Sequence, residues 1–244
     1  MSQHRLYIDN PLSPGSEITL TGDKAQYLGR VLRLRVQDDI AVFNGEDGEA
    51  TATIVAITKS KVSLIVRNKI ETNTESSLKV HLVQGISRGE RMDFVVQKAT
   101  ELGVKRITPV LTEYGVVKLS ADRGAKRQEH WQKVAISACE QSGRIRPPLV
   151  EAPITMKDWF GQRTDKADTD LILQPGAATS LAAIDTPKTK VCLLIGPEGG
   201  FSQTEYEDAA ISGFQAVSLG PRVLRTETAA VAAIAVAQSL WGDL

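Results

Sequence analysis

Two loops near the C-terminal end of the chain constrain its fold most strongly, because each lies between an apolar run and a predicted helix. The first loop, Gly196-Pro197-Glu198-Gly199-Gly200, follows the apolar run 191–195, which is typical of a strand buried on both faces. Ser202 and Glu205 then form a capping-box pattern, which predicts the start of a helix. Glycine and proline interrupt regular structure here, and glycine lets a ligand approach the main chain closely.

The second loop, 219–225, repeats this order of elements. A short predicted strand over 216–219 ends at Gly220-Pro221, and Thr226 begins an alanine-rich helix that extends to Leu240. Open α/β sheets bind ligands at the carboxyl ends of their strands. We therefore expect the two loops to follow adjacent strands and to form one crevice. Neither loop contains G-x-G-x-x-G or G-x-x-x-x-G-K-[ST], which argues against nicotinamide cofactors and nucleoside triphosphates.

The rest of the chain divides into two patterns. Short predicted strands separated by turn signals extend to about residue 68 and indicate a small β-barrel. The stretch 68–77 is polar and poor in core residues, so we predict two domains, 1–72 and 73–244. In the second domain strands alternate with helices, which is typical of a mostly parallel sheet.

One helix of the second domain illustrates the pattern. Residues 91–102 are amphipathic, and we expect Phe94 and Val95 to lie on the buried face. Gly103 follows directly and is suited to ending the helix.

The composition limits the possible partners and cofactors. Lys plus Arg and Asp plus Glu number 29 each, so any RNA contact must come from local basic groups. The two cysteines are far apart, without C-x-x-C, and the three histidines are scattered, so we expect neither a disulfide framework nor a metal site. The longest uncharged apolar run, 229–237, falls short of the roughly 20 residues that cross a bilayer. With no signal-peptide pattern either, we expect a cytoplasmic protein without membrane contact.

Together the two loops resemble signatures of the knotted SPOUT class of RNA methyltransferases. The similarity is to the family that methylates N3 of uridine 1498 in bacterial 16S rRNA, and it rests on Gly-Pro-Glu-Gly-Gly at 196–200 and Leu-Gly-Pro-Arg-Val-Leu-Arg-Thr-Glu-Thr-Ala at 219–229. Segments 87–92, 97–103 and 138–144 are similar to that family as well. The resemblance spans nearly the whole chain.

This resemblance implies an α/β fold, with a SPOUT trefoil-knotted, mostly parallel sheet that has helices on both faces. A small PUA-like β-barrel domain that contacts RNA precedes it. The implied cofactor is S-adenosylmethionine, and the implied substrate is 16S rRNA within the 30S subunit. The class forms homodimers, and we expect an exposed alanine surface on the last helix to serve that purpose (Ala229, Ala230, Ala233, Ala237).

The resemblance also implies a cofactor site built largely from main chain. S-adenosylmethionine carries its own reactive methyl group, so the protein supplies binding, orientation and electrostatics. Leu219 and Leu224 would form apolar walls around the adenine and ribose, although both leucines are also compatible with ordinary core positions. The residues implied are Leu173, Gly196, Gly200, Leu219, Gly220 and Leu224.

The target atom sets the catalytic requirement. Uridine N3 hardly ionises at neutral pH, so an enzyme must expose the base and weaken its N–H bond. Glu198 and Glu227 are the carboxylates nearest the crevice in sequence, and either could act as the base. Glu227 has a simpler explanation too, because the helix dipole favours an acidic residue in a first turn. Arg225 could stabilise negative charge on the uracil oxygens.

Candidate RNA-binding arginines occur in both predicted domains. Arg30 and Arg33, with Arg35 close by, belong to the first domain. Three arginines in a short stretch are more often a solvated surface, but the PUA-like resemblance favours phosphate contacts. In the second domain the candidates are Arg88, Arg91, Arg144 and Arg222.

Two alternatives remain open. The same fold could be a nucleoside- or RNA-binding module that transfers nothing, or an enzyme that methylates another rRNA or tRNA nucleotide, including a ribose 2′-OH. Cofactor binding together with methyl transfer to small-subunit rRNA would separate these functions.

Overall fold

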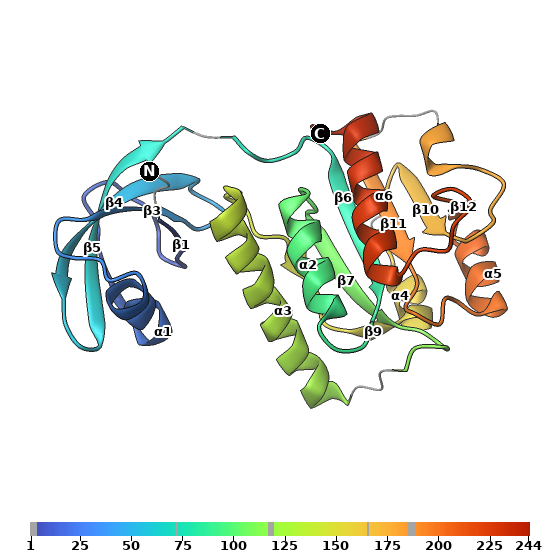
Figure 1. Ribbon diagram of the computed structural model, residues 1–244, viewed down its shortest axis with the longest axis horizontal. Coiled ribbons are helices and arrows are strands. Elements are labelled where there is room, and N and C mark those ends of the chain that lie inside the picture. The colour runs from blue at the N-terminus through green and yellow to red at the C-terminus, as the bar shows by residue number, and fades with distance from the viewer. Residues whose placement is uncertain (1–3, 72, 117–119, 165, 185–188) are drawn as a thin grey trace. The chain divides into compact units, whose positions relative to one another are not determined.

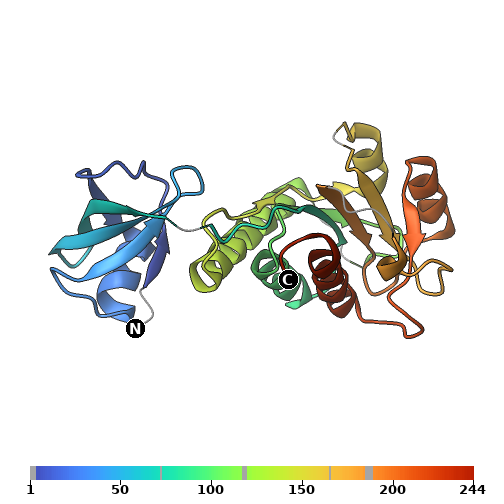
Figure 2. The ribbon, with the colours of Figure 1, turned by 90° about the horizontal axis from the view of Figure 1, so that it is seen from above.

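The computed structural model of the protein describes residues 4–71, 73–116, 120–164, 166–184 and 189–244 (Figures 1 and 2). The chain forms two compact units. One contains the residues up to Glu75 together with Cys139–Arg146, and the other contains Ser76–Ala138 and Pro147–Leu244. The domain boundary predicted after residue 72 falls at a position outside the described residues, so it stays a prediction.

The N-terminal unit is built on a five-stranded sheet in the order β1-β3-β4-β5-β2, in which only β1 and β3 pair in parallel. Burial alternates along its strands: in β2, Ile18 and Leu20 are buried and their neighbours are exposed, as expected where one face of a sheet covers a core. The expected small β domain is thus confirmed. The strands are β1 (Arg5–Tyr7), β2 (Glu17–Thr21), β3 (Asp39–Phe43), β4 (Glu49–Ile57) and β5 (Lys61–Ile70).

A short helix and a loop on this unit carry its candidate RNA-binding arginines. Helix α1 (Gly22–Gln26) continues into the π-helical turn η1 (Tyr27–Val31). Arg30, Arg33 and Arg35 are all exposed. Arg33 has φ 56°, a left-handed conformation that few residues other than glycine adopt, so the backbone turns sharply between the arginines.

The larger unit is organised around a second sheet in the order β12-β10-β11-β6-β7-β8, with β9 also paired to β7. Every strand pairing described in it is parallel, which confirms the predicted parallel sheet. The strands are β6 (Lys79–Gly85), β7 (Arg106–Leu111), β8 (Leu149–Val150), β9 (Ile154–Thr155), β10 (Thr169–Leu173), β11 (Lys190–Ile195) and β12 (Gln215–Val217).

Helices cover both faces of this sheet (Figure 1). Val191, Leu193 and Ile195 of β11 pack in the same core as α2 (Arg91–Glu101), α3 (Ala121–Ser142) and α6 (Thr226–Trp241). The intervening Cys192 and Leu194 pack on the opposite face with α4 (Met156–Gln162) and α5 (Gln203–Ile211). A strand with a core on each side needs apolar residues at every position, which is why the run 191–195 is unbroken.

Helix α2 differs from expectation at one position. Its buried residues include Met92, Val95, Val96 and Ala99, whereas Phe94 is 44% exposed. The spacing of three to four residues that places Val95 and Ala99 inward turns Phe94 outward. The Phe94 ring instead lies 6.0 Å from Nζ of Lys98. The predicted burial of Phe94 is therefore wrong.

The segment that joins β10 to β11 includes the short helix η2 (Leu181–Ala183), whose Leu181 packs in the same core as Ile234 of α6. Residues 185–188 of this segment lie outside the described part of the chain, and the trefoil knot stays a prediction. No helix among the described residues is both long and apolar enough to span a bilayer.

Candidate active site

A pocket of about 510 Å³ lies at the carboxyl ends of three neighbouring strands, β12, β10 and β11. The predicted adjacency of the two loops is wrong, because β10 pairs with both β11 and β12 and separates them. The end of β10 consequently forms part of the pocket wall through Leu173, Gln174 and Pro175. The two loops still meet in one crevice, since all three strands run in the same direction.

The structure brings all the proposed cofactor-binding residues into this pocket. Gly200 and Gly220 have φ values of 70° and 101°, which favour glycine, and a Cβ added at Gly200 would meet no atom within 4 Å. The main chain of both loops is therefore accessible to a ligand in the pocket. The lining residues among the predicted ones are Leu173, Gly196, Gly200, Leu219, Gly220 and Leu224.

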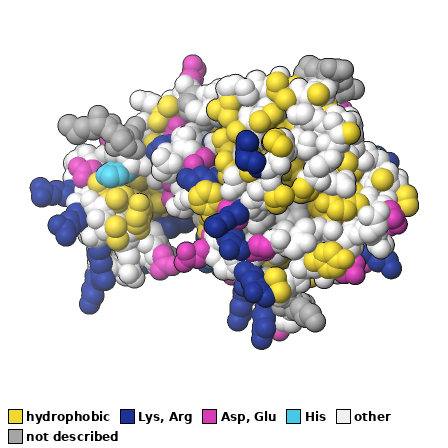
Figure 3. Space-filling model, turned by 45° about the vertical axis from the view of Figure 1, so that its right-hand side comes forward, with side chains coloured by type: hydrophobic (Ala, Val, Ile, Leu, Met, Phe, Trp, Pro, Cys, Tyr) yellow, Lys and Arg dark blue, Asp and Glu magenta, His cyan; other side chains and the backbone are white. Residues whose placement is uncertain are grey.

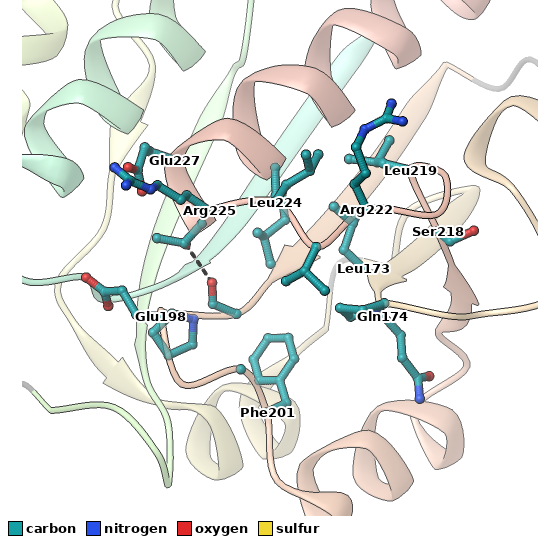
Figure 4. A pocket seen from close by; sticks show the side chains of 18 of the residues that line it. Leu173, Gln174, Glu198, Phe201, Ser218, Leu219, Arg222, Leu224, Arg225 and Glu227 are labelled. Carbon is teal, nitrogen blue, oxygen red and sulfur yellow. Dashed lines mark hydrogen bonds between the residues drawn. The ribbon is translucent and has the colours of Figure 1, made fainter.

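The two ends of the pocket differ in character (Figure 4). Glu198, Arg225 and Glu227 lie at one end, whereas Ser218, Leu219 and Arg222 lie at the other, with Leu173 and Leu224 between them. Phe201 lies below this row. The pocket thus has an apolar middle, one end with Arg222, and a second end, called the charged end below, with both carboxylates and Arg225.

A chain of hydrogen bonds beneath the pocket joins the two loops to the central sheet. Nε2 of Gln84, at the end of β6, donates to Oγ1 of Thr226 at 2.9 Å, and Oγ1 of Thr226 donates to the carbonyl oxygen of Gly196 at 2.6 Å. Gln84 and Thr226 are both buried. Gln84 was not among the residues expected at the site, although an amide in an otherwise apolar strand end was a usable signal.

The first loop packs tightly on this strand end and on a neighbouring loop. A Cβ added at Gly85 would lie 2.4 Å from Cδ of Pro197, so only glycine fits there. The predicted capping box at the start of α5 is confirmed, since Ser202 and Glu205 exchange side-chain and backbone hydrogen bonds. Glu205 also accepts a hydrogen bond from the backbone N–H of Glu113, which fastens the loop after β7 to α5.

At the charged end, Arg91 lies between the two candidate carboxylates. Its Nη1 is 2.5 Å from Oε1 of Glu198, and its Nε is 3.8 Å from Oε1 of Glu227. Partial burial by itself would raise the pKa of Glu198. Hydrogen bonds from the backbone N–H groups of Glu198 and Arg88 and from the Arg91 guanidinium outweigh burial and lower this pKa below its ordinary value.

The candidate RNA-binding arginines fall in different places. Arg91 and Arg222 line the pocket, and Arg88 lies beside it through the hydrogen bond of its N–H to Glu198. Arg30 and Arg33 are exposed on the N-terminal unit. The side chain of Arg144, in contrast, is only 3% exposed and pairs with Glu75 at 2.8 Å.

The expectation that Arg144 binds RNA does not fit this burial. A buried guanidinium that already holds a carboxylate cannot reach RNA without breaking that pair, so Arg144 has a structural role within the N-terminal unit. Within the described ranges, no group of three or more His, Cys, Asp or Glu side chains is arranged to hold a metal ion. Both cysteines are buried and free.

Comparison of the chain with known proteins identifies the class of protein to which this fold and pocket belong. Residues 74–238 match the family described as an RNA methyltransferase domain, and residues 20–67 match the RNA methyltransferase PUA domain. The resemblance seen in the sequence is thereby confirmed, and the chain is an RNA methyltransferase with an N-terminal PUA domain.

The relatives narrow this class to one family. Ribosomal RNA small subunit methyltransferase E of Buchnera aphidicola is 37% identical over 98% of this chain and 97% of that protein, and the Bacillus subtilis protein of the same name is 31% identical over 88% and 87%. The chain belongs to the ribosomal RNA small subunit methyltransferase E family.

Solved structures agree with this assignment. The methyltransferase E of Neisseria gonorrhoeae, bound to S-adenosyl methionine, is 40% identical, with a TM-score of 0.92 and coverage of 99% of both chains. A methyltransferase of Legionella pneumophila in complex with bound SAM is also 40% identical, with a TM-score of 0.95 and coverage of 100% of both chains.

Proposed function

We propose that this protein transfers a methyl group from S-adenosylmethionine to N3 of uridine 1498 in 16S rRNA. The observation that carries the proposal is the pocket formed by the two signature loops, in a chain that is 40% identical over nearly its whole length to a methyltransferase E bound to S-adenosyl methionine. The non-catalytic alternative lacks comparable support.

The residues of the pocket fit this cofactor. When bound, S-adenosylmethionine supplies an activated methyl group on a sulfonium. Leu173, Leu219 and Leu224 provide apolar surfaces for an adenine ring, and the open main chain at Gly200 and Gly220 offers polar groups to a ribose. The carboxylates of Glu198 and Glu227 balance the positive charges of Arg91 and Arg225 at that end of the pocket, so a cationic ligand meets no net repulsion there.

Methylation at N3 of a uridine requires one group that accepts the N3 proton and another that stabilises the negative charge left on the ring. We propose that this chemistry takes place at the charged end, where a carboxylate accepts the proton and Arg225 faces the uracil oxygens. Arg222, exposed beside the pocket, is suited to an RNA phosphate.

Binding of rRNA by a chain of zero net charge requires local basic groups. In the view of Figure 3, basic and acidic side chains are both exposed at the surface. We propose that Arg30 and Arg33 on the PUA domain hold rRNA phosphates, while Arg88 and Arg222 guide the target strand near the pocket. The proposed substrate is the 30S subunit in the cytoplasm.

We also propose a homodimer, but on a different surface from the expected one. Ala230, Ala233 and Ala237 are fully buried in the core of this chain, so they cannot face a partner. The partly exposed side of α6 contains Val231, Ala232 and Ala235 instead, and small apolar residues permit close packing of helices. Light scattering at micromolar concentration should give twice the monomer mass, and a monomer would contradict the proposal.

The function is tested by mass spectrometric mapping of modified nucleosides in 16S rRNA from cells that lack the protein. We expect N3-methyluridine to be missing at position 1498 and to return when purified protein and S-adenosylmethionine are added to 30S subunits from those cells. Loss of methylation at another nucleotide would establish the alternative target. Intact methylation throughout, with RNA binding retained, would favour the binding module.

A further inference from the structure

The two carboxylates at the charged end of the pocket do not have equivalent surroundings. We propose that Glu227 is the catalytic residue that accepts the N3 proton of the target uracil, an inference that rests on the proposed function. Arg91 is the positioning residue that holds Glu227 in place, and Glu198 anchors Arg91.

Glu198 is engaged by protein donors. Its Oε1 accepts a hydrogen bond from Nη1 of Arg91 at 2.5 Å and another from the backbone N–H of Arg88 at 3.1 Å. These donors would have to be released before Oε1 could accept a proton from a substrate. Glu198 therefore ties the first loop to the start of α2 and is poorly suited to act as a base.

Glu227, in contrast, has a carboxylate oxygen that no donor within the described part of the protein occupies. Its Oε1 faces Nε of Arg91 at 3.8 Å, and its side chain is 17% exposed in the wall of the pocket. Its Oε2 is shielded from solvent and has no hydrogen-bond partner among the described residues. An unsatisfied buried carboxylate oxygen is costly, so it indicates a group that is supplied when the site is filled.

The carboxylate can reach such a group with a small movement. The last side-chain torsion of glutamate is broad and roughly two-fold, so the carboxylate can turn and present an oxygen to the pocket while it remains beside Arg91. Figure 4 shows Arg225 at the same end of the pocket as Glu227. A uracil placed between them would direct N3–H toward a carboxylate and an oxygen toward a guanidinium.

In this reaction N3 loses a proton and gains a methyl group. The N3 proton passes to the Glu227 carboxylate, and the N3 electron pair forms the new bond to the methyl carbon. The electron pair of the broken carbon–sulfur bond stays on sulfur, so the product S-adenosylhomocysteine is neutral at that atom. Arg91 and Arg225 remain protonated throughout.

The test uses the full-length protein, 30S subunits that lack the modification, and the variants Glu227→Gln, Glu198→Gln and Glu129→Gln. Glu129 is exposed on α3 and outside the pocket, so it serves as the matched control. We expect Glu227→Gln to lower the single-turnover rate by about 10²- to 10⁴-fold. Its affinity for S-adenosylhomocysteine in calorimetry should stay within about threefold of the original, because the residue acts on the base.

Substrate acidity provides a readout that a structural role would not change. With 16S rRNA in which uridine is replaced by 5-fluorouridine, N3 is more acidic and needs less help from a base. The deficit of Glu227→Gln should therefore shrink with this RNA and shrink further as pH rises. Glu198→Gln acts only through Arg91, so its deficit with ordinary RNA should be much smaller than that of Glu227→Gln. Binding of the 5-fluorouridine RNA should also weaken with rising pH for the original protein but not for Glu227→Gln, because the Glu227 carboxylate repels an ionised N3.

Several outcomes would overturn the assignment. If Glu198→Gln has the larger deficit with ordinary RNA and the larger rescue by the acidic RNA, Glu198 is the base. If Glu227→Gln loses S-adenosylhomocysteine affinity in proportion to its rate, Glu227 binds the cofactor. If Glu227→Gln methylates N3 as fast as the original protein does, Glu227 is not the base, but the proposed function stands. If the original protein does not methylate N3, the proposed function itself is wrong.

A second variant tests the positioning role. Arg91→Lys keeps the charge but has one compact donor group in place of the extended guanidinium that spans the two carboxylates. We expect it to reduce the single-turnover rate with little change in S-adenosylhomocysteine affinity, and its deficit should also shrink with 5-fluorouridine RNA. An unchanged rate would show that Glu227 needs no support from Arg91.

Discussion

Oγ1 of Thr226 donates a hydrogen bond to the carbonyl oxygen of Gly196 at 2.6 Å, and this bond joins the first residue of α6 to the first loop of the pocket. The same hydroxyl accepts from Nε2 of Gln84 at 2.9 Å. Thr226 is 30 positions from Gly196 and 142 positions from Gln84 in the sequence, so one buried hydroxyl connects distant parts of the chain. We expect the shape of the pocket to depend on this connection.

The first prediction concerns Thr226. Thr226→Val removes the hydroxyl but keeps a branched side chain of similar size, so the Gly196 carbonyl loses a donor and the loop loosens. We expect the affinity for S-adenosylhomocysteine to fall about tenfold, which corresponds to the loss of one buried hydrogen bond. Calorimetry measures this affinity. Thr226→Ser keeps the hydroxyl and should bind normally, and a folded Thr226→Val with unchanged affinity would contradict the role of this bond.

The second prediction concerns Gly85. In Gly85→Ala the new Cβ would lie 2.4 Å from Cδ and 2.5 Å from N of Pro197, so the first loop must shift. We expect a lower melting temperature and at least about a tenfold loss of S-adenosylhomocysteine affinity, since backbone atoms cannot yield as a flexible side chain can. Gly161→Ala is the control, because its Cβ would meet nothing within 4 Å. Equal behaviour of the two variants would show that the close approach to Pro197 is unimportant.

The third prediction concerns the buried pair of Arg144 and Glu75. Arg144→Met leaves the Glu75 carboxylate buried without its guanidinium, and removing one partner of a buried pair typically costs about 3–5 kcal/mol. Urea unfolding should detect this loss. Arg30→Met, at an exposed position, should change stability by less than about 0.5 kcal/mol. An Arg144→Met protein of normal stability but weak RNA binding would return Arg144 to the RNA interface.

The fourth prediction separates RNA binding from catalysis. Arg33→Asn removes a charge while tolerating φ 56°, because asparagine adopts left-handed conformations more readily than most residues. If Arg33 binds an rRNA phosphate, the slope of log affinity against log salt should decrease by roughly 0.7 to 0.9. Affinity for S-adenosylhomocysteine should not change. A salt titration of 30S binding with an unchanged slope would exclude Arg33 from phosphate contact.

Arg225→Ala is the contrasting variant for that experiment. Its proposed partner is charge that develops on the uracil during the reaction, so the single-turnover rate should fall more than 30S affinity does. A variant that loses only 30S affinity would assign Arg225 to RNA binding instead.

The sequence by itself determined the elements and the chemistry of the loops. The capping box of Ser202 and Glu205 is local, so its residues alone predict the start of α5. The run 191–195 predicts a doubly covered strand because every position must be apolar when both faces are buried. The glycines at 196, 200 and 220 likewise indicated where main chain would line a ligand site.

Only the tertiary structure decided which of these residues meet. Pairing between strands places β10 between β11 and β12, although β10 comes before both in the chain. Whether an arginine is free or engaged depends on partners far away: Arg144 meets Glu75, and Arg91 meets Glu198 and Glu227. A sequence records charge and local propensity, whereas burial and pairing arise from contacts between distant segments, so the roles of these side chains follow from the fold.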